Sequence, residues 1–247
     1  MSTRRDDFSA LSSLPDVALI DFDNTLYSYA PCHGAAFATT VELGVKSLEV
    51  SEVEWVEAYA DARRDVHARL SGTAASHNRL LYFQGILDRF GATHRPDFAL
   101  RLYHLYWDTF VATMELHPGV PEFLTALGDA GVKRVFLSDL TADVQFKKLA
   151  AVGLGGCFDT IVTSEEAGAE KPDRAIYDYA LTKCGGGNSV WAVGDSPDRD
   201  IAGGQAIGAV TLLKANGVDV DEVADGAADC IFDDFVALTR HIRECAG

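Results

Sequence analysis

The stretch VALIDFDNTLY, residues 17–27, places two aspartates one residue apart at the end of a short apolar run. The run is continuously apolar rather than alternating, which is typical of a strand covered on both faces in a parallel sheet. If the chain stays extended, Asp21 and Asp23 lie on the same side of it. Two carboxylates this close repel each other in a poorly solvated site, so we expect a cation or a proton to join them.

Five more apolar runs follow in the second half of the chain, each bounded by turn residues or followed by a helical pattern. Between them lie segments with apolar residues at helical spacing, such as TADVQFKKLAAVGL and PDRAIYDYALTKCGGG. This alternation predicts an α/β fold with a doubly wound, mostly parallel sheet. The five runs are VKRVFLSD (132–139), FDTIVTS (158–164), SVWAVGD (189–195), AVTLLK (209–214) and ADCIF (228–232).

Residues 28–116 interrupt this alternation with helical patterns alone. Ser51 and Glu54 have the spacing of a capping box at a helix start. The residues that follow at intervals of three or four predict one apolar helix face, which we interpret as core packing within a helical bundle. That face consists of Trp55, Tyr59, Ala62, Val66 and Leu70. Similar patterns predict helices over 78–90 and 97–113.

These patterns divide the chain into three parts. We expect a flexible lead-in over residues 1–16, an α/β core over 17–27 and 117–247, and an α-helical cap over 28–116. Open α/β sheets bind ligands beyond the carboxyl ends of their strands. A cap inserted directly after the first strand should therefore cover that site as a lid.

The overall composition limits the classes of partner. The formal net charge is −16, from 37 acidic and 21 basic residues, which disfavours a nucleic acid or a membrane surface because both attract basic proteins. The five scattered cysteines have no paired spacing and indicate reduced thiols, so we expect a cytoplasmic protein. No window approaches the length of a transmembrane span. The sequence does not indicate the oligomeric state.

Polar residues follow several of the predicted strands. Ser138 ends the second strand, Lys171 precedes a proline that we expect to begin a helix, Asp195 ends the fourth strand, and Asp200 follows about one turn later. With Asp21 and Asp23, these aspartates would bring four carboxylates to one sheet edge, where they require a hard cation. Oxygen ligands with room for water favour Mg²⁺. The ion and the lysine would attract a phosphate, and a carboxylate can attack phosphorus as a nucleophile.

Taken together, these residues resemble the haloacid dehalogenase superfamily, whose four motifs occur here in order. The motifs are DFDNTL, the serine of FLSD, EKPD and GDSPDRD. The resemblance covers essentially the whole chain after residue 16 and includes the helical cap. It implies a phosphatase that works through an aspartyl-phosphate on Asp21, with Asp23 as the general acid and base.

The resemblance also implies roles for the remaining motif residues. Ser138 would hold the phosphoryl group, and Lys171 would balance its charge as a catalytic and phosphate-binding residue. Thr25 would order the loop after the nucleophile and so belong to the phosphate-binding set. The implied Mg²⁺ site consists of Asp21, Asp23 through its backbone carbonyl, Asp195, and Asp200 directly or through water.

Some positions narrow the choice within the superfamily. Dehalogenating members generally lack an acid at the position of Asp23, so its presence favours a phosphatase. Asp139 stands where many relatives have asparagine, and we interpret it as a helix cap because an extra acid beside a phosphate is unfavourable. Lys46, the only lysine of the insertion, is interpreted as a surface residue rather than as the Schiff-base lysine of phosphonate-cleaving members.

Two alternatives to a phosphatase are open at this point. A phosphomutase of the same fold uses the same two aspartates and differs mainly in how its cap limits water. A receiver-like phosphoacceptor module shares the acid pair, the hydroxyl and a Lys-Pro pair. It is disfavoured because in such modules the Lys-Pro pair comes last, whereas here Lys171 precedes the final acids, and because a ninety-residue lid has no place in it.

The cap should select the substrate, which we expect to be a small phosphorylated metabolite of the nucleotide or sugar phosphate class. Polar residues just after the catalytic loop and in the segment ASHNRLLYF are the candidates for this role. They are Tyr29, His33, His77, Arg79 and Tyr82.

Overall fold

The structure is a computed structural model, and it describes residues 6–217 and 228–247. Its centre is a six-stranded sheet with the order β3-β2-β1-β4-β5-β6, in which every neighbouring pair is parallel. All six predicted strands are present, which confirms the predicted fold class. They are β1 (Val17–Ile20), β2 (Lys133–Ser138), β3 (Thr160–Thr163), β4 (Val190–Gly194), β5 (Val210–Lys214) and β6 (Cys230–Phe232).

The first strand has a central place in this sheet. β1 pairs with β2 on one side and with β4 on the other, so the strand order reverses at β1. A reversal of this kind opens a crevice beyond the carboxyl ends of the strands. Asp21 and Asp23 follow β1 directly and therefore lie at this switch point.

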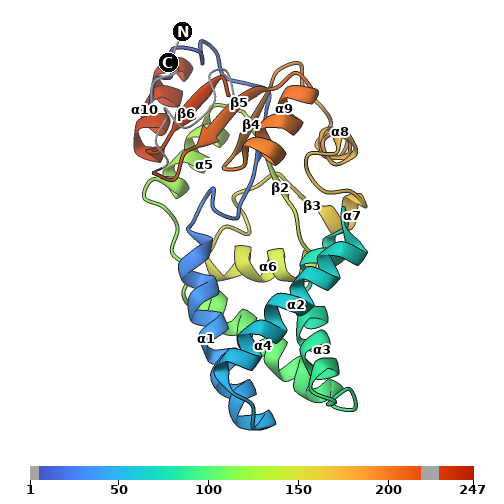
Figure 1. The fold of residues 1–247 in the computed structure, drawn as a ribbon. Helices are drawn as coiled ribbons and strands as arrows, with labels where there is room; N and C mark the ends of the chain where they lie inside the picture. Colours follow the sequence, from blue (N-terminus) through green and yellow to red (C-terminus); the bar gives the residue numbers. More distant parts are fainter. Residues whose placement is uncertain (1–5, 218–227) are drawn as a thin grey trace.

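Helices cover both faces of the sheet (Figure 1). The side chains of β1 alternate between two apolar clusters: Ala18 and Ile20 pack with α5, α6 and α10, whereas Val17 and Leu19 pack with α8. Burial on both faces explains why the strand is continuously apolar. The core helices are α5 (Val120–Asp129), α6 (Ala142–Ala151), α7 (Ser164–Ala167), α8 (Arg174–Lys183), η2 (Pro197–Ile201), α9 (Ala202–Ala206) and α10 (Phe235–Ala246).

The segment between β1 and α5 forms a helical body at one end of the sheet, with α6 lying beside it (Figure 1). The predicted capping box is confirmed, because Ser51 Oγ accepts from the Glu54 amide while the Glu54 carboxylate accepts from the Ser51 amide. Trp55, Tyr59 and Val66 of the predicted apolar face are buried. The helices are α1 (Tyr29–Leu48), α2 (Glu52–Leu70), η1 (Ala74–His77), α3 (Arg79–Arg89) and α4 (Pro96–Ala112).

The segment before β1 contacts the far end of the sheet. The Asp6 amide donates to the Ile231 carbonyl at 2.9 Å, Leu11 is buried, and Phe8 stacks on His241. Residues 1–5 of the expected lead-in lie outside the described residues. Between residues 6 and 217 and from 228 to 247, no helix has both the length and the apolar character that spanning a membrane requires.

Candidate active site

A cavity of about 530 Å³ lies between the sheet edge and the helical body. The core contributes the strand-end residues, and the helical body contributes residues from α1, α2, η1 and α3. The cavity thus has a core wall and a cap wall. The predicted site residues that line it are Asp21, Asp23, Ser138, Lys171, Asp195 and Asp200 on the core wall, and Tyr29, His77 and Arg79 on the cap wall.

Asp21 is held in place by both of its carboxylate oxygens. Lys171 Nζ donates to Oδ1 at 2.6 Å, and the Thr25 hydroxyl donates to Oδ2 at 2.7 Å. Thr25 is fully buried behind the aspartate and does not itself line the cavity. Burial raises the pKa of Asp21 well above its usual range, and the carboxylates of Asp200 and Asp195 add to this, although Lys171 opposes it. The carboxylate therefore requires a second cation to stay ionised at the bottom of the cavity.

Three carboxylates form a cluster that suits a metal ion. One oxygen from each of Asp21, Asp195 and Asp200 lies within 4.8 Å of the others. Burial, followed by the charge of Asp200, raises the pKa of Asp195 to about 6. Such a set of hard oxygen donors, open on one side to a polar cavity, fits Mg²⁺. The carboxylate of Asp23 is not part of the cluster.

Asp200 reaches this cluster because of a glycine. It lies in the short π-helical turn η2, where its Oδ2 accepts from the Ser196 amide at 3.0 Å and its Oδ1 accepts from Lys171 Nζ at 2.6 Å. A Cβ atom on Gly194 would lie 2.2 Å from the Asp200 carboxyl carbon. The glycine of the GDSPDRD motif is therefore required by the close approach of this side chain to the strand.

Asp23 has a separate set of partners. Lys148 Nζ donates to both carboxylate oxygens, at 2.7 and 2.9 Å, and Gln145 Nε2 and the Tyr27 hydroxyl also donate to the carboxylate. Burial raises the pKa of Asp23, but Lys148 and these hydrogen bonds outweigh it and lower the pKa below its ordinary value. Asp23 is therefore ionised at neutral pH in this arrangement.

Sequence reasoning missed Lys148 and Gln145, which are both fully buried. They lie on α6, on the same face as the apolar Val144 and Leu149. The available signal was a lysine and a glutamine within the apolar stripe of a predicted helix, because such positions normally hold apolar residues. Nothing in the spacing alone points from that stripe to Asp23, which is 125 residues away.

Ser138 ends β2, and its hydroxyl accepts from Gln145 Nε2 at 2.8 Å. The interpretation of Asp139 as a helix cap is wrong. Its Oδ1 accepts from the Lys171 amide at 3.0 Å, so it orders the loop that carries the lysine. The first amide of α6, that of Ala142, is instead bound by the Glu165 carboxylate. A cap from a neighbouring segment leaves no sequence signal near the helix.

The start of the helix that follows Lys171 also differs from the prediction. Pro172 does not begin α8, which starts at Arg174 after Asp173 as the N-cap. The Asp173 side chain accepts from the Ala175 amide at 2.9 Å. An aspartate side chain can accept a hydrogen bond from a free amide of the first helical turn, which the side chain of Pro172 cannot do. The helix therefore begins directly after Asp173.

On the cap wall, the predicted residues fall into two groups. Tyr29, His77 and Arg79 line the cavity, and His77 Nε2 lies 3.2 Å from the Glu170 carboxylate of the core. His33 and Tyr82 are not among the lining residues of the described cavity. His33 Nδ1 is 2.7 Å from the Tyr106 hydroxyl, and Tyr82 donates to the Ser76 carbonyl at 2.6 Å. The side chains of these two residues therefore bond to other residues of the helical body and do not face the cavity.

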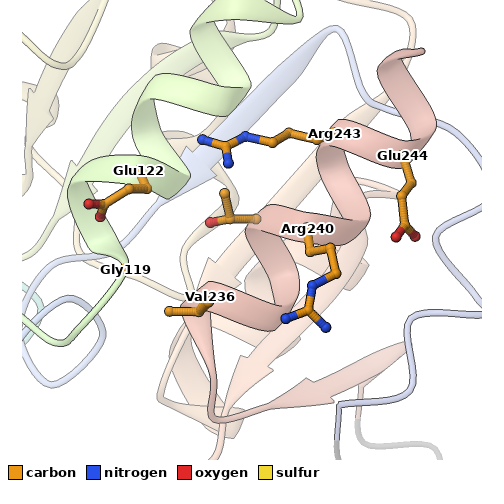
Figure 2. Close-up of a pocket in the computed structure, with 7 residues that line it drawn as sticks. Gly119, Glu122, Val236, Arg240, Arg243 and Glu244 are labelled. Carbon is orange, nitrogen blue, oxygen red and sulfur yellow. The ribbon is translucent and has the colours of Figure 1, made fainter.

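A second hollow of similar size lies between α5 and α10, around Gly119 and Val236 (Figure 2). Figure 2 shows the charged side chains of Glu122, Arg240 and Arg243 spread around this hollow. None of the predicted site residues lines it. The cavity at the strand ends is therefore the candidate active site.

Comparison with known proteins identifies the family that the chain resembles. The model of the haloacid dehalogenase-like hydrolase family matches residues 15–208. The chain is 36% identical over 214 residues to a ribulose-1,5-bisphosphate 5-phosphatase of Halopiger xanaduensis, covering 85% of this chain and 90% of that protein. It is 28% identical over 200 residues to a glyceraldehyde 3-phosphate phosphatase of Methanopyrus kandleri, covering 81% of this chain and 83% of that protein.

Solved structures share the fold. A 2-haloacid dehalogenase from Pseudomonas syringae pv. Tomato superposes with a TM-score of 0.73 at 20% identity, covering 92% of this chain and 100% of that chain. A HAD phosphatase from Thermococcus onnurineus superposes with a TM-score of 0.69 at 18% identity, covering 92% and 97% respectively. At these identities the likeness concerns the fold alone, since one fold serves several chemistries.

Proposed function

The chain belongs to the haloacid dehalogenase-like hydrolase family as a phosphatase-type member, and on that premise we propose that it hydrolyses a small phosphorylated metabolite through an aspartyl-phosphate on Asp21. The observation that supports the proposal most is the position of Asp21. Its carboxylate lies at the bottom of a cavity, is oriented by Lys171 and Thr25, and stands beside two further acids that suit Mg²⁺.

We propose that Asp21 attacks phosphorus. A new bond forms between one carboxylate oxygen and phosphorus, and the ester bond to the leaving oxygen breaks. Lys171 and Ser138 would hold the phosphoryl oxygens, since both line the cavity next to the nucleophile. Mg²⁺, held by Asp21, Asp195 and Asp200 with the backbone carbonyl of Asp23, would neutralise the charge of the phosphoryl group when bound.

We propose that Asp23 acts as the general acid and then as the general base. It gives a proton to the leaving oxygen in the first step. In the second step it takes a proton from the water that attacks phosphorus and releases Asp21. Lys148 donates to both oxygens of the Asp23 carboxylate and so restricts its orientation. Because Lys148 and the hydrogen bonds keep Asp23 ionised in the free protein, we propose that its carboxylate takes up a proton when the negatively charged phosphate binds beside it, and then passes this proton to the leaving oxygen.

The relatives support a phosphorylated sugar as the substrate class, because the two described above are named for ribulose-1,5-bisphosphate and glyceraldehyde 3-phosphate. We propose that residues 28–116 form the cap domain that encloses this substrate, and that the protein works in the cytoplasm. Enclosure by α1, α2, η1 and α3 would limit the water that reaches the site during the first step.

The test is the release of p-nitrophenol from p-nitrophenyl phosphate. We expect activity with Mg²⁺, none in excess chelator, and a loss of about 10³-fold or more in Asp21→Asn, because an amide cannot replace the attacking carboxylate. Asp88→Asn, an exposed position on α3, is the matched control and should keep full activity. Turnover by Asp21→Asn at the wild-type rate would rule the mechanism out.

A further inference from the structure

Arg79 is a buried cation that has no carboxylate partner among the described residues. The residue is 9% exposed. One of its terminal nitrogens donates to the His77 carbonyl at 2.8 Å and the other donates to the Tyr29 hydroxyl. Its Nε is buried and has no hydrogen-bond partner among the described residues. All of the contacts that the guanidinium makes are therefore with neutral groups.

The other buried cations of the described chain are paired differently. Lys148 pairs with Asp23, Lys171 pairs with Asp21 and Asp200, and Lys214 pairs with Asp233. Burying a charge is costly unless an opposite charge or a set of strong hydrogen bonds compensates it. Among the buried cations in residues 6–217 and 228–247, Arg79 alone forms no ion pair.

Aromatic rings compensate part of this cost. The guanidinium carbon lies 5.0 Å from the ring centre of Tyr82, 5.6 Å from that of Tyr106 and 5.8 Å from that of Trp107. Such cation–π contacts are favourable but weaker than a charge-assisted pair with an anion. They hold the guanidinium in place and leave its charge available to a ligand.

A second arginine lines the same cavity. Arg63 of α2 is exposed and, within the described part of the chain, forms no ion pair with a carboxylate. The cap wall thus presents two cations from different helices. On the core wall, by contrast, Lys171 is already engaged by two aspartates, and Arg199 forms an ion pair with Asp139 at 3.6 Å. The cations that are free to meet a new anion are on the side opposite the nucleophile.

We propose that Arg79, assisted by Arg63, forms a subsite for a second anionic group of the substrate, and this inference rests on the proposed phosphatase function. The reacting phosphate would meet Asp21 on the core wall, while a second phosphate or a carboxylate at the other end of the molecule would meet the guanidinium on the cap wall. A planar guanidinium matches either group, because both offer two oxygens to its fork of N–H donors.

The experiment compares pairs of substrates that differ by one anionic group. Ribulose 1,5-bisphosphate against ribulose 5-phosphate tests a second phosphate, and 3-phosphoglycerate against glycerol 3-phosphate tests a carboxylate. We expect the wild type to prefer the doubly anionic member of at least one pair by about tenfold or more in kcat/KM. The pair that shows the preference identifies which anion the subsite takes.

Variants then assign the preference to the cap wall. Arg79→Met keeps an unbranched apolar stem and removes the charged guanidinium, and it should lower the preference by about tenfold. Arg63→Gln, at an exposed position that tolerates substitution, should lower it by about threefold and replaces Arg79→Met if that variant does not fold. Arg101→Gln on the exposed face of α4 removes one cap charge away from the cavity and should leave the preference unchanged.

Binding without turnover separates this inference from the proposed function. In the Asp21→Asn background, calorimetry should show that the doubly anionic member of the preferred pair binds about tenfold more tightly than the singly anionic member, and Arg79→Met should abolish the difference. If the wild type did not hydrolyse p-nitrophenyl phosphate, the proposed phosphatase function would be wrong. The binding difference would still support the anion subsite in that case. Equal kinetics and equal binding of both members of each pair, beside normal p-nitrophenyl phosphate turnover, would overturn the subsite alone.

Discussion

The two walls of the cavity handle charge in opposite ways. On the core wall, acids and lysines neutralise one another over distances of 2.6–2.9 Å, as Lys171 does with Asp21 and Asp200, and Lys148 with Asp23. On the cap wall, Arg79 is surrounded by aromatic rings and neutral oxygens. The lysines of the core wall are thus already paired with carboxylates, whereas the guanidinium on the cap wall has no carboxylate partner among the described residues.

This difference suits two separate tasks, catalysis on the core wall and substrate selection on the cap wall. A preorganised set of charges acts on any phosphate ester that reaches it, because the phosphoryl group is the same in all of them. Selection requires contacts with the rest of the molecule, which differ from one substrate to the next. The contrast can be tested on each wall in turn.

The largest effect is expected on the core wall at Lys148. Replacing it by methionine leaves the Asp23 carboxylate without its cation, so we expect a loss of about 3 kcal/mol in the free energy of unfolding. A fall of about 10²-fold in turnover should accompany it because the carboxylate is no longer oriented. Urea unfolding and p-nitrophenyl phosphate turnover measure the two effects.

A double-mutant cycle sharpens this prediction. Asp23→Asn combined with Lys148→Met should cost less stability than the sum of the single changes, because the double variant contains no lone buried charge. The neighbouring Lys147 serves as a control, since it is 38% exposed and pairs with Asp108 on the surface. Lys147→Met should change stability by at most about 1 kcal/mol. Strictly additive effects of the two core substitutions would contradict a coupled pair.

A smaller effect is expected in the packing of the cap. A Cβ atom on Gly44 of α1 would lie 2.2 Å from the Trp55 ring, whereas one on Gly34 of the same helix meets nothing within 4 Å. We therefore expect Gly44→Ala to destabilise the protein by about 1–3 kcal/mol through overpacking. Gly34→Ala should stabilise it by up to about 1 kcal/mol through helix propensity. Thermal unfolding measures both effects. If the melting temperatures of the two variants shifted in the same direction, the predicted difference in packing around the two glycines would be wrong.

The smallest effect concerns pH and the cap. Burial, together with the charges of Arg79 and Arg63, lowers the pKa of His33 to about 4. The unfolded chain, in which histidine has its ordinary pKa of about 6.5, takes up the proton first. Stability should therefore fall as the pH drops from about 6.5 to 4 and lose nothing further from this group below that range. The contribution is about 1–2 kcal/mol, because His33 is partly exposed and solvent screens its charge.

His33→Gln provides the comparison. The variant should lose less stability than the wild type between pH 6.5 and 4, measured by urea unfolding at each pH, and the two curves should run parallel above pH 7. Wild-type and variant curves that stay parallel over the whole range would show that His33 keeps its ordinary pKa in the folded protein.

Sequence reasoning was strongest for the core. The continuously apolar strands, the helices between them and the capping box at Ser51 were all predictable, because each depends on residues close together in the chain. It was also possible to predict that strand-end residues such as Asp21 and Asp200 come together, since parallel strands bring their carboxyl ends to one edge. The cluster of Asp21, Asp195 and Asp200 agrees with that prediction.

Most of the residues that sequence reasoning misinterpreted or missed share one physical cause: their partners lie far away in the sequence. Asp139 binds the Lys171 amide, 32 residues away, instead of capping the nearby helix. Lys148, which looks like an ordinary lysine of an amphipathic helix, pairs with Asp23 across 125 residues. His33 and Tyr82 point to partners behind the cap wall, so a polar side chain near the site did not by itself predict a lining residue.

Local periodicity and topology suffice to predict the α/β class, the helical insertion and the set of acids, hydroxyls and lysine at the strand ends. Which of these charges neutralise one another depends on the tertiary structure. Lys148 and Lys171 have carboxylate partners and Arg79 has none among the described residues. The cost of burying a charge depends on what the fold places within a few ångströms of it, and no spacing along the chain encodes that distance.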